Sequence, residues 1–187
     1  LGSGNFVAGS TAGDSIVSGG NYNTLVGDNA GTAITTGDNN TALGTFSLPA
    51  NTTGSDNSAI GFNALDSNTT GANNTATGAY SLAANTTGAN NVAVGHAAFD
   101  ANTTGNNNVA IGRNALTTST TAHNNVAVGS DAMILNTTGT SNVAMGKEAL
   151  YANTTANNNT ALGYQAMLDN TTGANNTASG YRALQGN

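Results

Sequence analysis

The side chains that could take part in proton transfer are few and scattered along the sequence. There are two histidines, His96 and His123, and nine acids, but no cysteine. Nucleophilic catalysis needs a base beside its nucleophile. His96 directly follows a glycine, whereas His123 lies in an Asn-rich stretch. We therefore interpret both as solvated surface residues, and the sequence predicts no catalytic residue and no enzyme.

The acids do not form the pattern of a metal or cofactor site. Asp66 and Asp100 share a position in the repeat described below, but they lie two repeats apart. The other seven form no column along the repeat: Asp14, Asp28, Asp38, Asp56, Asp131, Glu148 and Asp169. Calcium-binding β-rolls repeat G-G-x-G-x-D, and here Gly19-Gly20 is followed by Asn21-Tyr22 without a repeating Asp. We expect no dedicated metal site and no cofactor.

Asparagine sequons are the most frequent motif with a chemical meaning. Asn-x-Thr is the acceptor sequence for N-glycosylation. One row opens Asn-Thr-Thr at Asn51, Asn68, Asn85, Asn102, Asn136, Asn153 and Asn170. A second row comprises Asn39, Asn73, Asn158 and Asn175. We favour the interpretation that Asn and Thr serve the turn itself; a glycan-coated filament remains the alternative.

A strict period organises these motifs. Glycine recurs at every seventeenth position, without exception, at Gly27, Gly44, Gly61, Gly78, Gly95, Gly112, Gly129, Gly146, Gly163 and Gly180. We call these the period glycines and expect them to be structural turn residues. The unit reads N-x-A-φ-G-x-x-A-L-x-x-N-T-T-G-x-N, where φ is apolar, and NVAVGHAAFDANTTGNN is a nearly complete copy.

Each seventeen-residue unit is predicted to form one short strand and to contribute a few apolar side chains to the core. In Val109-Ala110-Ile111 the middle side chain points away from its two neighbours. A second apolar column follows four residues after each period glycine, from Leu48 to Leu184. One unit cannot bury its apolar side chains alone, but stacking units about 4.8 Å apart builds a continuous core. We predict an all-β parallel β-solenoid of about eleven coils, roughly 50 Å long.

The repeat extends over one continuous domain. Residues 23–187 form regular copies, whereas 1–22 form an imperfect first coil, because the interval from Gly9 to Gly27 is one residue longer than the period. We expect the additional residue to lie in a turn. Neither end has a charged or helical cap segment, and solenoids need polar caps to remain monomeric. The sequence therefore predicts either a piece of a longer chain or coils that stack end to end.

Composition excludes several classes of partner. Asn (32), Ala (32), Thr (30) and Gly (25) dominate the 187 residues, and charged residues are only 6%. The three basic residues, Arg113, Lys147 and Arg182, cannot neutralise a run of phosphates, so we expect no nucleic-acid partner. No apolar run approaches the length of about 18 residues that a membrane-spanning helix needs, so no membrane insertion is expected in this segment. No signal peptide is recognisable.

The repeat resembles two groups of known proteins. Asn57-Ser58-Ala59-Ile60-Gly61 is similar to the head repeat of YadA-like trimeric autotransporter adhesins. The longer phrase from Ala64 to Gly78, ALDSNTTGANNTATG, resembles repeats of bacterial and phage tail-fibre domains. The resemblance covers residues 21–187 and implies a left-handed β-roll assembled as a homotrimer. Adhesin heads have shorter repeats, and no neck, coiled-coil stalk or membrane anchor is recognisable in these residues.

These observations predict a structural or adhesive protein. We expect a rigid segment of an extracellular fibre, on a cell surface or a virion, that associates with itself as a trimer or a head-to-tail filament. A cell-surface receptor or carbohydrate is the other expected partner. The alternative is a module that binds a repetitive ligand, polysaccharide or ice, through its Asn, Thr and aromatic rows. Adjacent Thr residues point to opposite faces of an extended chain, so a flat Thr grid for ice is not expected.

Overall fold

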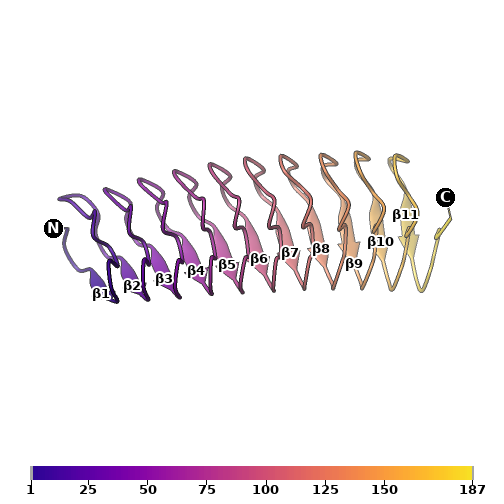
Figure 1. Ribbon diagram of the computed structural model, residues 1–187. Helices are drawn as coiled ribbons and strands as arrows, with labels where there is room; N and C mark the ends of the chain where they lie inside the picture. The colour runs from indigo at the N-terminus through magenta and orange to yellow at the C-terminus, as the bar shows by residue number, and fades with distance from the viewer. Residues whose placement is uncertain (1, 187) are drawn as a thin grey trace.

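The computed structural model describes residues 2–186 as a single-chain parallel β-solenoid (Figure 1). Its eleven strands form one sheet in chain order, and the described residues contain no helix. The strands are β1 (Phe6–Ala8), β2 (Thr24–Val26), β3 (Thr41–Leu43), β4 (Ser58–Ile60), β5 (Thr75–Thr77), β6 (Val92–Val94), β7 (Val109–Ile111), β8 (Val126–Val128), β9 (Val143–Met145), β10 (Thr160–Leu162) and β11 (Thr177–Ser179). The predicted fold is confirmed.

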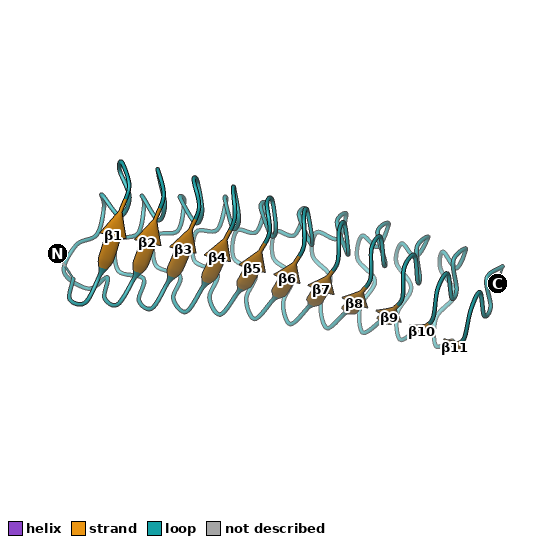
Figure 2. Ribbon diagram, turned by 90° about the horizontal axis from the view of Figure 1, so that it is seen from below, coloured by secondary structure: helices purple, strands orange, loops and turns teal. Residues whose placement is uncertain are grey.

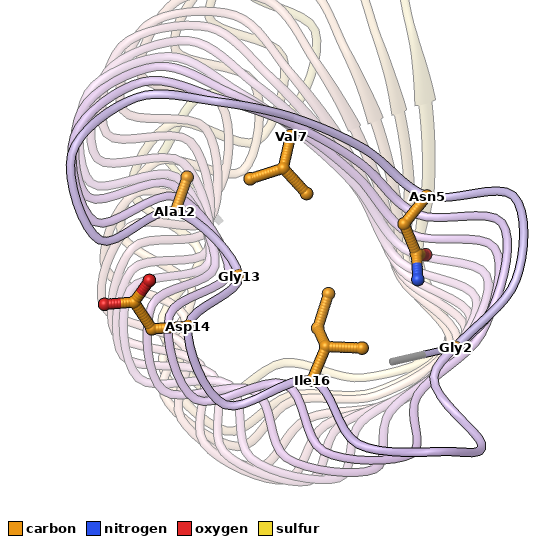
Figure 3. Close-up of a pocket in the computed structure, with 7 residues that line it drawn as sticks. All are labelled: Gly2, Asn5, Val7, Ala12, Gly13, Asp14 and Ile16. Carbon is orange, nitrogen blue, oxygen red and sulfur yellow. The ribbon is translucent and has the colours of Figure 1, made fainter.

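The strands line one side of the rod, and turns close the rest of each coil (Figure 2). From β2 onward each strand pairs with the strand one period further on, so that Ala93 lies opposite Ala110. Viewed along the axis from the N-terminal end, the chain turns counter-clockwise as it recedes (Figure 3). The solenoid is therefore left-handed.

The additional residue of the first coil lies in a turn, as predicted. β1 and β2 pair with an offset one residue longer than the period, Val7 opposite Leu25. The N–H of Val17 still bonds with this longer offset, to the carbonyl of Thr35, whereas the N–H of Asn21 bonds with the regular offset, to Asp38. The change of offset therefore falls in the turn between Val17 and Asn21, and the regular stacking resumes after it.

The core consists of alanine methyl groups facing one large side chain per coil. The middle residue of each strand from β3 to β11 is a buried Ala. The core column, four residues after the period glycine, is fully buried at Leu48, Leu65, Leu82, Phe99, Leu116, Met133, Leu150 and Met167. The alternation in the strands is confirmed, and it places the small residue inside. The Ala column therefore lines the narrow interior of the chain and is not available as an interface between chains.

The second coil fills the same interior with the large and small residues exchanged. Leu25 replaces the strand alanine, Gly31 occupies the core column, and Ile34 follows three residues later; Leu25 and Ile34 are fully buried. A Cβ on Gly31 would lie 2.7 Å from Leu25 Cδ2 and 2.8 Å from Ile34 Cδ1. Close packing leaves no room for a large core-column side chain beside Leu25 and Ile34, so the exchange conserves the volume of the core.

The turns require backbone conformations that side chains normally avoid. The core column has φ between +49° and +55° from Leu48 to Leu184. The left-handed conformation costs about 1–2 kcal/mol per residue, whereas burying a Leu, Phe or Met side chain gains about 1.5–3 kcal/mol. The stacked coil thus stabilises a local conformation that the isolated segment would not adopt.

The period glycines occupy a conformation available only to glycine. They directly follow the strands with φ between +124° and +139°. A Cβ on Gly95 would lie 2.7 Å from both the carbonyl carbon and the oxygen of Gly112 in the next coil. Backbone conformation and close approach between coils both explain why glycine recurs at this position of every coil.

Candidate functional surfaces

A column of buried asparagines runs beside the strands. This strand ladder comprises Asn23, Asn40, Asn57, Asn74, Asn91, Asn108, Asn125, Asn142 and Asn159, all fully buried. Within it, the Oδ1 atom of Asn91 accepts the backbone N–H of Asn108 at 2.9 Å, and its Nδ2 atom donates to the carbonyl of Gly105 at 2.8 Å. Each side chain therefore satisfies backbone groups of neighbouring coils that cannot reach water.

A second column lies in the turn and overlaps the first row of sequons. This turn ladder comprises Asn51, Asn68, Asn85, Asn102, Asn136, Asn153 and Asn170, all at most 1% exposed. The Nδ2 atom of Asn85 donates to Asn68 Oδ1 at 2.7 Å and to the carbonyl of Gly88 at 3.0 Å. Side-chain amides of successive coils are thus bonded to one another along the rod axis.

Burial corrects the interpretation of these seven asparagines as candidate glycosylation sites. N-glycosylation attaches the sugar to Nδ2, and in the folded coil Nδ2 faces the interior and is hydrogen-bonded to backbone carbonyl groups. A glycan at Asn51, Asn68, Asn85, Asn102, Asn136, Asn153 or Asn170 is incompatible with this packing. In the folded coil these Asn side chains instead bond the backbone of their own turn, as Asn102 Nδ2 does to the carbonyl of Gly105.

The second row of sequons has the opposite environment. Asn39, Asn73, Asn158 and Asn175 are exposed on a ridge one residue before the strand ladder. Their φ values lie between +56° and +63°, a left-handed conformation that Asn tolerates better than most residues. Of the eleven predicted acceptors, these four therefore remain sterically open to a modifying enzyme.

Ser119 interrupts the turn ladder, and we expect its replacement by Asn to stabilise the protein. Its hydroxyl oxygen is the one buried side-chain polar atom without a hydrogen-bond partner in residues 2–186. In Ser119→Asn the new amide can donate to Asn102 Oδ1 and accept from Asn136 Nδ2. Restoring these bonds should raise the free energy of unfolding by about 1–2 kcal/mol, measurable by urea denaturation.

The matched control is Ser119→Ala, which removes the unpaired hydroxyl without adding a bond and should change stability by less than about 0.5 kcal/mol. Ala122, three residues on, replaces the glycine found there in most coils. Asn153 coexists with Ala156 in the equivalent arrangement, where Asn153 Nδ2 reaches the Ala156 carbonyl at 3.2 Å. A loss of stability in Ser119→Asn would contradict the proposal that the turn ladder holds neighbouring coils together.

Two adjacent rows of threonine lie beside the turn ladder. In most pairs the hydroxyl of the first threonine donates to a backbone carbonyl of the next coil, as Thr86 Oγ1 does to the carbonyl of Thr103 at 2.9 Å. The second threonine is exposed at Thr53, Thr70, Thr87, Thr104, Thr121, Thr138, Thr155 and Thr172. The rod thus presents one regular file of exposed threonines, which is not the two-dimensional grid considered for ice.

The outer face of the sheet is apolar over much of its length. The strand residue before each period glycine points outward, with Leu43 and Met145 close to half exposed. The face continues through Ile60, Ile111 and Leu162, each more than a third exposed. An exposed, contiguous apolar surface commonly marks a site of association.

The edge next to this face carries aromatic side chains in the N-terminal part of the rod and charged side chains further along. Phe46, Phe62, Tyr80 and His96 form a continuous edge-to-face row with ring centroids 5.5–6.4 Å apart. Further along, the same edge carries Arg113, which pairs with Asp131 at 3.2 Å, and Lys147, which pairs with Glu148 at 3.1 Å. Every basic residue of the chain therefore lies in its C-terminal half.

The acids and histidines differ in their surroundings. Burial raises the pKa of Asp66, and that of Asp100 although His96 nearby opposes the shift. His123 Nδ1 accepts the backbone N–H of Asn106 at 2.9 Å, which makes it a structural acceptor. Residues 2–186 contain no group of three potential metal ligands and no helix suited to crossing a membrane.

No protein-family model, no curated protein and no solved structure matches the chain.

Proposed function

We propose that this protein is a structural and adhesive segment of an extracellular fibre, in which the solenoid acts as a rigid spacer. The observation that carries the proposal is the uninterrupted bonding between coils. Every strand from β1 to β11 is paired in sequence order, and the two Asn ladders run inside the rod, one beside the sheet and the other in the turns. In-register stacking of this kind resists bending and proteolysis.

The surface of the rod supports a role in presenting repeated side chains to a binding partner. The rod displays exposed Thr and Asn side chains at the same positions in successive coils, for example Thr87 with Asn90 and Thr104 with Asn107. Such regular rows suit repeated weak contacts with a carbohydrate or a cell-surface receptor, whose combined strength grows with their number.

The apolar outer face supports lateral self-association. It runs along the rod axis through Leu43, Ile60 and Ile111, so parallel copies could bury it over their whole length. A homotrimer of the adhesin type would use this face, because the Ala column is already enclosed within each chain. We therefore propose a homotrimer as the lateral assembly.

A spacer should change length in whole coils, which a deletion can test. Removing residues 79–112 joins Gly78 to Arg113 and deletes two full periods of the repeat. The variant should remain folded, and its largest dimension in small-angle X-ray scattering should fall by about 10 Å, the height of two coils. Immunogold labelling of unpermeabilised producing cells, or of virions, should place the protein outside.

The matched control deletes residues 79–104, which is not a multiple of the period and joins Gly78 to Gly105. It brings turn residues into core positions and should lose the cooperative thermal transition. Equal tolerance of both deletions would contradict the solenoid spacer, and labelling confined to the cell interior would contradict the extracellular role.

A further inference from the structure

The two ends of the rod expose groups that are buried or bonded everywhere between them. At the C-terminal end Leu184, a core-column residue, is 47% exposed, whereas its equivalents from Leu48 to Met167 are fully buried. At the N-terminal end an open depression of about 500 Å³ leads into the interior (Figure 3). Val7 and Ile16 face it, and Gly13 contributes no side chain. One end thus projects an apolar side chain and the other is hollow.

The backbone groups at the two ends are complementary in kind and position. Inside the rod, Thr160 N–H donates to Asn176 O, and Gly180 N–H donates to Leu162 O. One coil further on, the corresponding groups are Thr177 N–H and Ser179 O, which have no partner within residues 2–186. Their counterparts at the other end are Asn5 O and Gly9 N–H, which likewise have no partner among the described residues.

The strand ladder continues the same complementarity. Asn176 N–H donates to Asn159 Oδ1, and Asn159 Nδ2 donates to Gly173 O. The side chain of Asn176 has no corresponding partner in the described chain. A coil placed beyond it with the phase of the first coil would offer Asn5 N–H and Gly2 O at those positions.

Opposite charges at the two ends favour contact between the N-terminal end of one copy and the C-terminal end of another. Inside the rod, the residue five places after a period glycine lies above the residue two places after the glycine of the preceding coil. Thr117 Oγ1 donates to the carbonyl of Ala97 at 2.6 Å in this way, and Thr32 does so to Thr11. Across a junction the same relation would place Asp14, five residues after Gly9, beside Arg182, two residues after Gly180. Both side chains are exposed in the single chain.

We propose that a second copy of this chain docks its N-terminal face on the C-terminal face of the first, pairing β1 with β11 in parallel across a junction closed by Asp14 and Arg182. Leu184 then enters the depression lined by Val7, Gly13 and Ile16. This deepens the proposed fibre function and rests on it, because it names a second copy as the axial partner of the rod.

The test uses the full chain and two charge reversals. The unmodified chain should form linear assemblies in negative-stain electron microscopy, with a sedimentation coefficient that rises with concentration. Arg182→Glu and Asp14→Arg, each alone, should weaken association at least tenfold, because each brings like charges together. The double variant restores an opposite pair and should recover association to within about threefold of the unmodified chain. Lys147→Glu makes the same change in net charge as Arg182→Glu but lies two coils away from the C-terminal coil, and it should leave association unchanged.

Three outcomes would overturn the junction: a chain that remains single at every concentration, association only side by side without lengthening, or a double variant no better than the single ones. Circular dichroism verifies that the exposed substitutions leave the coil folded. A chain that passes the two-coil deletion test but forms no linear assembly remains a spacer, so failure of the junction is distinct from failure of the fibre function.

Discussion

Gly95→Ala is expected to destabilise the rod by about 3–5 kcal/mol, because it combines backbone strain with a steric clash, each worth roughly 1–3 kcal/mol. Gly95 has φ +133°, and its Cβ would lie 2.7 Å from the backbone of Gly112. The atoms in contact, the carbonyl carbon and oxygen of Gly112, belong to the backbone and cannot rotate away as the end of a flexible side chain could. The defect should separate the coils on its two sides, so that limited proteolysis cleaves near residues 95–112, with a lower urea midpoint.

The matched control is Gly88→Ala, ten residues after a period glycine. Gly88 has no left-handed φ, although its Cβ would press against Asn85 Oδ1 and against the carbonyl oxygen of Gly105 in the next coil. The chain itself has Ala122 and Ala156 at this position, so the turn can accept a methyl group, and we expect a cost of roughly 1–2 kcal/mol. Equal costs at Gly88 and Gly95 would contradict the account of the period glycines.

Asn91→Ala should reduce the free energy of unfolding by about 2–4 kcal/mol, because it leaves buried backbone groups unpaired and opens a small cavity. The substitution removes the acceptor of the Asn108 N–H and one donor to the Gly105 carbonyl. Urea denaturation monitored by circular dichroism gives the change directly.

Asn90→Gly is the control for Asn91→Ala. Asn90 is the preceding residue, is exposed and has φ +59°, which glycine adopts without strain. A change below about 0.5 kcal/mol is expected. If Asn91→Ala costs no more than Asn90→Gly, the buried amides do not hold the coils together.

The fold could be predicted from the sequence because its signals are periodic. The glycine spacing determines the stacking register, and the buried column from Leu48 to Met167 follows directly from the absence of polar residues at that position. The placement of the additional residue in a turn was also predictable, because the seventeen-residue spacing is regular from Gly27 onward. In each case the repeat averages out the ambiguity of a single short segment.

The environment of the site residues could not be predicted in the same way. Alternation in Val109-Ala110-Ile111 shows that the faces differ, but only the narrowness of the coil determines that alanine is inside and Ile111 outside. Likewise, Asn68 and Asn73 both begin sequons, yet one is buried and the other exposed. Their difference arises from turn geometry, including left-handed residues that local propensity disfavours.

The exposed groups at the two ends required the structure. Asp14 and Arg182 lie far apart in the sequence and share no repeat position, so nothing in the pattern pairs them. Only the offset between neighbouring coils, seen at Thr117 and Ala97, brings their positions together.

Cryo-electron microscopy of the protein in its native assembled state tests the central claim most directly, because it determines how the coil axis lies relative to the assembly. A spacer rod predicts fibres whose diffraction has a meridional reflection near about 4.8 Å, with successive coils stacked along the fibre axis and the strand ladder of Asn side chains continuous inside. Coils stacked across the fibre axis, or a native state that forms no fibre, would contradict the account.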